Sequence, residues 1–459
     1  MQLNTTGCEN SAFGRKAMCC NTTGFNNTAL GQAALVINST GCYNTAVGNR
    51  ALVANTTSNN TAVGYVALCQ NTTGSGNTAV GVKALHSNTT AGANTAHGLC
   101  ALYSNTTGTC NTAVGYRALP VNTTQSGNTA SGFYSLKCNT GANNAAFGNR
   151  AALHNTTGIN NVAVGSESLC SNTTGTQNVA IGMNAVRNNS TGCNNTGVGY
   201  GAGFLNTTSN YNTAVGACSL YVNTSGAKNT AVGTFALISS TCACVNTAVG
   251  FRALSKTTTG CANTAVGNCA LYCNTTGCRN VAVGAWAMQC GAGTYNIAMG
   301  YNTLQCNTGN NNTALGYNAM LKSTSGNNNV AVGRDALYCN TTACHNVAIG
   351  YRALCDNSTG FKNTASGNYA SQLNTTGDCN SSFGYQALRN NTTASNNTAS
   401  GYQALRNTTT GSANTAVGSR SLYENTTGCC LTATGWNSLV NNTTGCGNTA
   451  YGYASGCSI

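Results

Sequence analysis

The chain has 459 residues, of which only 5% are charged, and 19 lysines and arginines against six acidic residues give a formal net charge of +13. It contains 56 glycines and a single proline, and 41% of its residues are hydrophobic. Disordered chains are usually rich in charge and proline, and a membrane helix needs about 18 consecutive apolar residues, a run that the sequence lacks. The composition therefore disfavours both a disordered chain and a helical membrane span.

A 17-residue repeat with the consensus N-T-T-G-x-x-N-T-A-V-G-x-x-A-L-x-x occurs 27 times, and we number its positions from the first Asn. Copies begin at Asn4, Asn21, Asn38 and onward to Asn442, and four of the 26 intervals are 16 residues instead of 17. An unbroken short repeat indicates a solenoid, in which each copy buries its apolar side against its neighbours. We expect a single repeat domain over residues 1–459, without separate caps.

Each copy is read in chain order as a bend followed by a ladder. Asn at positions 1 and 7 and Gly at positions 4 and 11 are expected to form turns, because they tolerate positive φ or bond their own backbone. The segment N-T-A-V predicts one short strand and x-A-L-x, at positions 13 to 16, predicts a second. No apolar stripe of helical period occurs. The predicted fold is all-β, a parallel β-solenoid (β-helix or β-roll) of about 27 coils with 17 residues per coil.

Variation between copies separates constrained positions from permissive ones. Position 9 is almost always alanine, as in Ala113, which suggests a close approach of two backbones. Position 10 accepts residues as different as Val47 and Ser131, so its pocket is looser or half exposed, and position 15 is mostly leucine. The short copies begin at Asn55, Asn139, Gly291 and Asn307, and all lose a residue between positions 1 and 7. That segment is predicted to be a bend that tolerates deletion.

Stacking 27 coils at about 4.8 Å each predicts a rod of roughly 130 Å. Every residue then meets its own kind above and below, which favours Asn over Asp, since an amide column bonds to itself whereas a carboxylate column repels. The core of one coil is small, and we expect burial between chains to supplement it.

The segment N-T-A-V-G, at Asn44–Gly48, Asn77–Gly81, Asn111–Gly115 and Asn212–Gly216, resembles the repeat of trimeric autotransporter adhesin (YadA-like) heads. The longer N-T-A-V-G-Y-x-A-L form at Asn111–Leu119 is similar to repeats of phage and large-virus tail-fibre-like proteins. The resemblance implies a β-roll or β-helix rod, often trimeric, used for attachment or as a shaft. The 17-residue period differs from the shorter adhesin repeat.

The N-T-T start of most copies matches the N-glycosylation acceptor Asn-x-Ser/Thr. Copies without the acceptor still begin with a residue that forms turns, so a turn role is the alternative. The candidate acceptors are Asn4, Asn21, Asn38, Asn55, Asn71, Asn88, Asn105, Asn122, Asn155, Asn172, Asn189, Asn206, Asn223, Asn274, Asn340, Asn357, Asn374, Asn391, Asn425 and Asn442.

The 27 cysteines gather around the N-T-T-G bend, some bracketing it and others at the same phase in successive coils. A spacing of about 4.8 Å between coils is within disulfide range, so an extracellular rod could be stapled along its axis. Reduced thiols acting as small apolar residues are the alternative. The candidates are Cys244, Cys261, Cys273, Cys278, Cys290, Cys306, Cys339, Cys344, Cys429 and Cys446.

No catalytic, metal or cofactor site is predicted, because the four histidines fall in different phases without ligand spacing. Position 13 carries a sparse basic stripe, including Lys16, Arg50, Lys83 and Arg117, with aromatic neighbours at position 12. The stripe could attract anionic polysaccharide or another acidic surface. It is too thin for nucleic acid, which requires denser basic contacts.

These features predict a non-enzymatic structural fibre or filament subunit, extracellular or on a virion or cell surface. Its expected partners are copies of itself, in a head-to-tail filament or a trimeric rod, with no nucleic acid and no membrane span. The alternative is an adhesin or receptor-binding fibre whose positions 10 to 13 recognise glycans or anionic surfaces. Ice binding is disfavoured, because the two adjacent threonines of each bend point to opposite faces of a strand.

Overall fold

The computed structural model describes residues 3–457 and divides the chain into two compact units, unit 1 ending at Lys228 and unit 2 beginning at Asn229. Both units are built from coils with one three-residue strand each, 27 in all, and residues 3–457 contain no helix. Unit 1 contains β1 (Ser11–Phe13), β2 (Thr28–Leu30), β3 (Thr45–Val47), β4 (Thr61–Val63), β5 (Thr78–Val80), β6 (Thr95–His97), β7 (Thr112–Val114), β8 (Thr129–Ser131), β9 (Ala145–Phe147), β10 (Val162–Val164), β11 (Val179–Ile181), β12 (Thr196–Val198) and β13 (Thr213–Val215). Unit 2 contains β14 (Thr230–Val232), β15 (Thr247–Val249), β16 (Thr264–Val266), β17 (Val281–Val283), β18 (Ile297–Met299), β19 (Thr313–Leu315), β20 (Val330–Val332), β21 (Val347–Ile349), β22 (Thr364–Ser366), β23 (Ser381–Phe383), β24 (Thr398–Ser400), β25 (Thr415–Val417), β26 (Thr432–Thr434) and β27 (Thr449–Tyr451).

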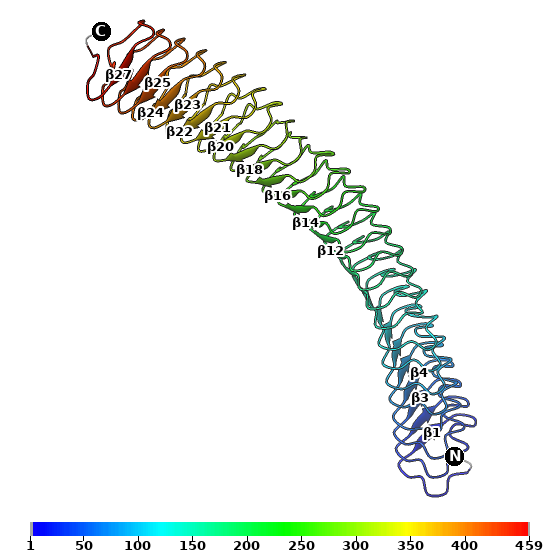
Figure 1. The fold of residues 1–459 in the computed structure, drawn as a ribbon. Coiled ribbons are helices and arrows are strands. Elements are labelled where there is room, and N and C mark those ends of the chain that lie inside the picture. Colours follow the sequence, from blue (N-terminus) through cyan, green and yellow to red (C-terminus); the bar gives the residue numbers. More distant parts are fainter. Residues whose placement is uncertain (1–2, 458–459) are drawn as a thin grey trace. The chain divides into compact units, whose positions relative to one another are not determined.

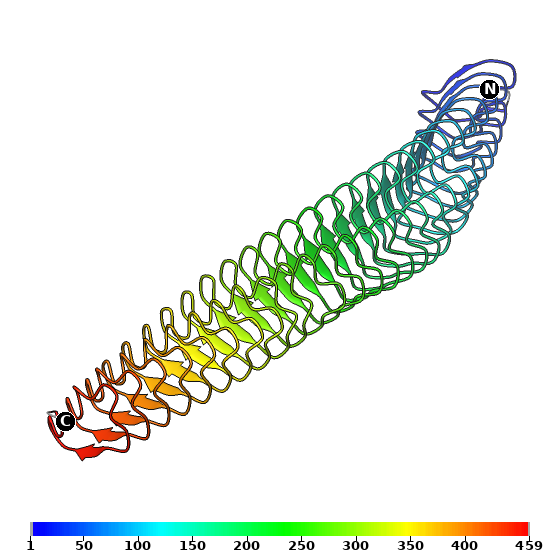
Figure 2. The ribbon, with the colours of Figure 1, turned by 90° about the horizontal axis from the view of Figure 1, so that it is seen from above.

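Within each unit the strands pair in parallel and in register from coil to coil. Ala96 of β6 faces Ala113 of β7, and Ala248 of β15 faces Ala265 of β16. Figures 1 and 2 show the strands of each unit stacked along one side of its coils. The predicted parallel β-solenoid and its N-T-A-V strand, observed as T-A-V, are confirmed. Residues 3–457 include no helix with the length and apolar character needed to cross a membrane.

The prediction of a second strand at positions 13 to 16 is wrong, because these residues form a turn. In the coil that begins at Asn105, Arg117 and Leu119 lie in the left-handed region, with φ of 47° and 52°. Two such residues, one residue apart, curl the chain into a turn. The turn still bonds to its neighbours, since Arg117 N donates to Leu99 O and Leu119 N donates to Ser135 O, both at 3.0 Å. Left-handed residues recur at positions 13 and 15 of the other coils.

The apolar core consists of alanine at positions 9 and 14 and leucine at position 15. Ala113, Ala118 and Leu119 are completely buried in their coil. Val114 at position 10 is 38% exposed, as the variability of that position predicted. The second alanine column, at position 14, is an addition to the predicted core, and serine replaces it where its hydroxyl can donate to a nearby carbonyl, as Ser135 Oγ does to Gly132 O at 3.1 Å.

The asparagines at position 1 begin the predicted bends, and their side chains form a buried column. Asn105 is completely buried. Its Nδ2 donates to Gly108 O in its own coil and to Asn88 Oδ1 in the preceding coil, both at 2.9 Å. Each amide therefore closes its own bend and bonds the next amide in the stack, which confirms the predicted amide column.

The asparagines at position 7 form a second buried column. Asn111 N donates to Asn94 Oδ1, and Asn94 Nδ2 donates to Gly108 O, both at 2.9 Å. Position 7 does not adopt positive φ; the preceding residue does, as in Cys110 with φ of 58°. The buried amides thus supply to the interior the polar partners that side chains of alanine and leucine lack.

Glycine serves different purposes at its two regular positions. Position 11 is glycine in all 27 copies; Gly115 has φ of 127°, and a Cβ there would lie 2.7 Å from Gly132 O in the next coil. Gly108 at position 4 is not left-handed, and its absent Cβ instead makes room for the adjacent coil. Positive φ therefore explains position 11, as predicted, but not position 4, which accepts Ala91.

The short coils lose a residue from the bend, as predicted. In the coil that begins at Asn139, Nδ2 of this residue donates to Gly141 O at 2.7 Å, two residues away instead of three. The strand register is unchanged, since Ala146 pairs with Ala130 on one side and Ala163 on the other. Thr140 keeps the bond typical of position 2, since its Oγ1 donates to Thr156 O at 3.0 Å, so the missing residue is the one at position 3, which is exposed in Thr107.

Candidate functional site

The structure places the candidate glycosylation sites inside the coils. All of the candidate asparagines except Asn4 are buried. Glycans attach to Nδ2, and this atom is a buried donor: in Asn172 it donates to Asn155 Oδ1 at 2.6 Å and to Gly175 O at 3.0 Å. A glycan on such an atom would displace these bonds and has no room in the coil, so glycosylation of the folded coils at these buried amides is incompatible with this geometry.

The candidate cysteines are brought together between coils but not across a bend. Cys244 N lies 3.3 Å from Cys261 Sγ, and Cys261 N lies 3.1 Å from Cys278 Sγ. Cys344, which brackets a bend together with Cys339, instead contacts the neighbouring coil, where its Sγ accepts a hydrogen bond from Asn327 N at 3.3 Å. The ten candidates are free thiols in this structure. Alignment at the same phase, as predicted, therefore produces contact, and no bond joins the cysteines that bracket a bend.

Cys429 and Cys446 form a close pair of thiols, whose Sγ atoms are 2.9 Å apart. Their hydrogen bond raises the pKa of Cys429 to about 11 and lowers the pKa of Cys446. Elsewhere, burial raises the pKa of Cys355 to about 12. Because the thiolate is the nucleophile, Cys446 is better suited than Cys429 to react near neutral pH.

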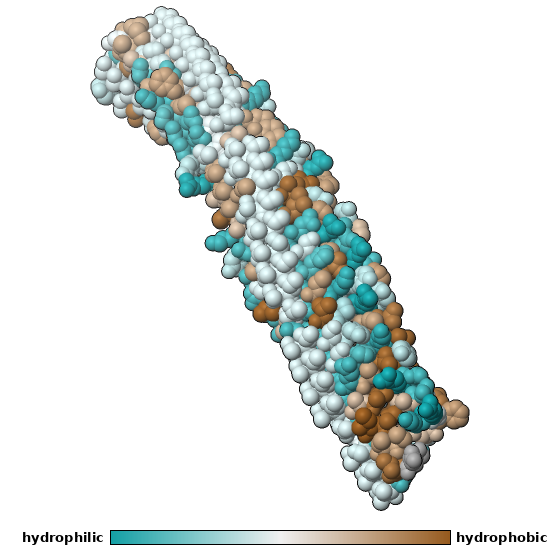
Figure 3. All heavy atoms as spheres, turned by 90° about the vertical axis from the view of Figure 1, so that its right-hand side faces the viewer, coloured by the Kyte–Doolittle hydropathy of each residue, from teal (hydrophilic) through white to brown (hydrophobic). Residues whose placement is uncertain are grey.

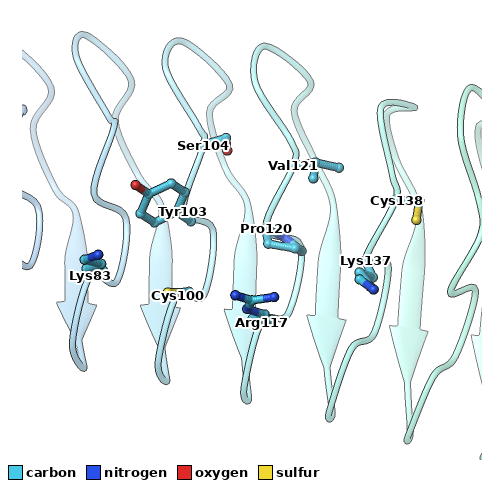
Figure 4. A pocket seen from close by; sticks show the side chains of 9 residues that line it. All are labelled: Lys83, Cys100, Tyr103, Ser104, Arg117, Pro120, Val121, Lys137 and Cys138. Carbon is cyan, nitrogen blue, oxygen red and sulfur yellow. The ribbon is translucent and has the colours of Figure 1, made fainter.

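A hollow on the surface of unit 1 is lined by three cations. Its volume is about 430 Å³, and it spans four consecutive coils. Lys83, Cys100 and Arg117 form one row across the coils, with Tyr103 and Pro120 in a second row beside them (Figure 4). The other lining residues are Ser104, Val121, Lys137 and Cys138. No acidic residue lines the hollow, so its chemistry suits an anion.

Unit 2 carries a column of exposed and half-buried aromatic rings, which we call the aromatic column. Tyr301 and Tyr317 stack with centroids 5.6 Å apart, and Tyr385 and Tyr402 do so at 5.5 Å. Tyr317 is 49% exposed and Tyr402 is 51% exposed. The column consists of Trp286, Tyr301, Tyr317, Arg334, Tyr351, Tyr369, Tyr385 and Tyr402.

A second hollow, of about 330 Å³, opens in the aromatic column. The Arg334 guanidinium lies 5.7 Å from the Tyr317 ring and 5.6 Å from the Tyr351 ring, and it pairs with Asp335 at 3.3 Å. Asn318 and Arg352 also line this hollow. It combines ring faces with both donors and acceptors, the combination with which a polar ring such as a sugar is held.

Strongly hydrophilic and strongly hydrophobic side chains gather on one side of the coils, and the side next to it has residues of intermediate hydropathy, drawn in white (Figure 3). The side with strongly hydrophilic and hydrophobic side chains differs from coil to coil, so it is the side that could bind one ligand in preference to another. Sequence reasoning identified the basic stripe but missed both hollows. For the first hollow, a signal was present in the only proline of the chain, Pro120. No group of three or more potential metal ligands occurs in the described part of the chain.

The one-strand coil, the invariant glycine and the two amide columns define a tandem-repeat β-solenoid protein. No protein-family model matches the chain, and no curated protein shows significant similarity to it.

Proposed function

We propose that the chain is a structural fibre or filament subunit, a non-enzymatic β-solenoid rod that acts outside the cell or on a virion or cell surface. The observation that carries this proposal is the continuity of the bonding between coils. In unit 1, for example, backbone, position-1 and position-7 bonds all join the coil of Asn105 to its neighbours. Such bonding suits length and stiffness. The adhesin-head and tail-fibre resemblance supports the same role.

Electron microscopy of the purified full chain, combined with sedimentation analysis, tests this proposal. We expect elongated particles, in self-associated rods or filaments. Discrete compact particles across a range of concentration and salt would contradict the proposal. Copies of the chain are the expected partners, because the apolar residues that remain exposed at position 10 gain by burial between chains.

A second candidate function, recognition of surface glycans by an adhesin-like fibre, is favoured by the aromatic column. The exposed rings of Tyr317, Tyr385 and Tyr402 provide apolar surface against which sugar rings can pack. We expect Tyr385→Ala with Tyr402→Ala to weaken binding on a glycan array. Tyr65→Ala is the matched control, since Tyr65 is also exposed at position 12 (52%) but lies in unit 1. Equal binding by both variants would contradict this function.

A further inference from the structure

The cations at position 13 of unit 1 follow a period of two coils. They occupy the first, third, fifth, seventh and ninth coils, and all five are exposed: Lys16, Arg50, Lys83, Arg117 and Arg150. Uncharged residues occupy position 13 of the coils between them: Ala33, Val66, Cys100 and Tyr134. Position 13 accepts both charged and uncharged residues, so the coil fold does not require a cation there. The alternation of charged and uncharged residues is therefore a separate pattern in addition to the 17-residue period.

Register keeps these cations on one line. Cys100 N donates to Val82 O and Arg117 N donates to Leu99 O, both at 3.0 Å, so position 13 always bonds position 12 of the preceding coil. At about 4.8 Å per coil, consecutive cations are about 9.6 Å apart. This separation slightly exceeds the Debye length of about 8 Å at physiological salt, so the cations tolerate one another without counter-charges.

In the coils from Lys16 to Arg150 the only acidic residue is Glu9, at position 6 of the first coil, and among residues 3–457 no ion pair joins it to these cations. Residues 10–166 contain seven lysines and arginines and no aspartate or glutamate. In the coil after Arg150, position 13 is the acidic residue Glu167, which pairs with Arg150 at 3.5 Å and with Arg187 at 2.8 Å. The hollow of Figure 4 lies between Lys83 and Arg117, two consecutive members of the column, and Lys137 lines it as well. We call the cations from Lys16 to Arg117 the cation column.

We propose that the cation column binds a linear anionic polysaccharide that carries one carboxylate or sulfate per two sugar residues. One coil rises by about the length of a sugar ring in an extended chain, so two rings span two coils and bring one anion to each cation. The hollow receives the rings between two anions, beside the apolar faces of Tyr103 and Pro120. A DNA strand carries a charge every 3.4 Å or so, much denser than the column. This binding function goes beyond the structural role, and it concerns unit 1, whereas the aromatic column belongs to unit 2.

The test moves one cation out of phase without changing the net charge. The full chain is titrated with a fluorescent hyaluronan decasaccharide, a probe with one carboxylate per two sugars, in buffer of low ionic strength. In the variant Lys83→Ala with Cys100→Lys, the cation shifts by one coil to a site with nearly the same φ, 56° instead of 55°. We expect an affinity about two- to fivefold lower, as for the loss of one exposed charge pair.

Further arms make the result decisive. Arg117→Ala with Tyr134→Lys shifts the next cation and has the same expected effect, so a folding failure of one variant does not end the test. Arg252→Gln, which removes an exposed position-13 cation from unit 2, should leave the affinity unchanged. Polygalacturonate, with a carboxylate on every sugar, should bind the parent and the shifted variants equally. Any of three results would overturn the proposal. The first is unchanged hyaluronan affinity in both shifted variants. The others are binding of neutral dextran, or of a single-stranded oligonucleotide of equal charge, that is tighter than the binding of hyaluronan.

Discussion

Replacing one buried asparagine of the position-7 column should weaken two neighbouring coils. Asn94→Ala removes the acceptor of Asn111 N and one donor to Gly108 O, both at 2.9 Å. Gly108 O keeps the bond from Asn105 Nδ2 at 2.9 Å, whereas the structure of residues 3–457 gives Asn111 N no second acceptor. A buried donor left unpaired costs about 1–3 kcal/mol and a lost hydrogen bond about 0.5–1.5 kcal/mol, so we expect about 2–4 kcal/mol in total.

Hydrogen exchange measured by mass spectrometry is the suitable assay, because the stability of a solenoid is a sum over coils and their interfaces and not a single two-state quantity. A loss of about 2–4 kcal/mol lowers the protection of amides in β6 and β7 by about 30- to 700-fold. The matched control is Thr95→Ala, an exposed strand residue at a position where another coil has Ala145; its effect should be below about 0.5 kcal/mol. Equal protection in Asn94→Ala and Thr95→Ala would refute the reasoning.

The variant Asn94→Asp separates the acceptor role from the donor role. An aspartate keeps the acceptor for Asn111 N, but only its protonated form can donate to Gly108 O. Burial and the bond donated to Gly108 O favour the neutral form and outweigh the bond from Asn111 N, which favours the carboxylate, so the folded-state pKa should lie above the unfolded value of about 3.9. The protonated form then contributes stability that is fully present below about pH 3.9 and is lost as the pH rises through the folded-state pKa. Protection that does not fall with rising pH would contradict this.

Three other perturbations test different parts of the coil. Gly115→Ala should destabilise unit 1 by more than Gly108→Ala, because φ of 127° is strained for any residue with a Cβ, whereas position 4 accepts alanine in Ala91, and hydrogen exchange of the two variants measures the difference. Leu431→Asn should stabilise the coils around β26 in unit 2 by about 1 kcal/mol, because it restores an amide to the position-7 column, where Leu431 is the buried exception; lower hydrogen-exchange protection of these coils would be the contrary result. Alkylation with iodoacetamide at neutral pH should modify Cys446 before Cys429, since their shared hydrogen bond lowers the pKa of the first and raises that of the second to about 11; peptide mapping reports the order.

The sequence was most informative where a column tolerates only one kind of residue. The alanine of position 9 predicted close packing, and Ala113 is completely buried. The short copies predicted the bend, and the coil of Asn139 keeps its strand register. Both inferences depend on comparing many copies of one position, which a repeat makes possible within a single chain.

The sequence misled where residue type has two physical explanations. Asparagine is common in turns, so a turn was expected at position 7, but Asn111 N donates to Asn94 Oδ1 inside the coil and the preceding Cys110 has the positive φ instead. Leu119 has φ of 52°, a conformation that leucine rarely adopts, so no local rule predicts that x-A-L-x is a turn. The bonds to neighbouring coils impose this conformation, and the hollows likewise depend on side chains from several coils.

The left-handed residues have a consequence for how the chain folds. The coil of Asn105 has three of them outside glycine, Cys110, Arg117 and Leu119, and each costs about 1–2 kcal/mol. The bonds that offset this cost are made mostly to adjacent coils, so a lone coil has no stable form. Folding must begin with a nucleus of several coils formed together and then advance one coil at a time, each completed coil acting as the template for the next. A ribosome-bound segment shorter than that nucleus would therefore stay unfolded. Once the nucleus has formed, each new coil can fold by bonding to the last completed coil.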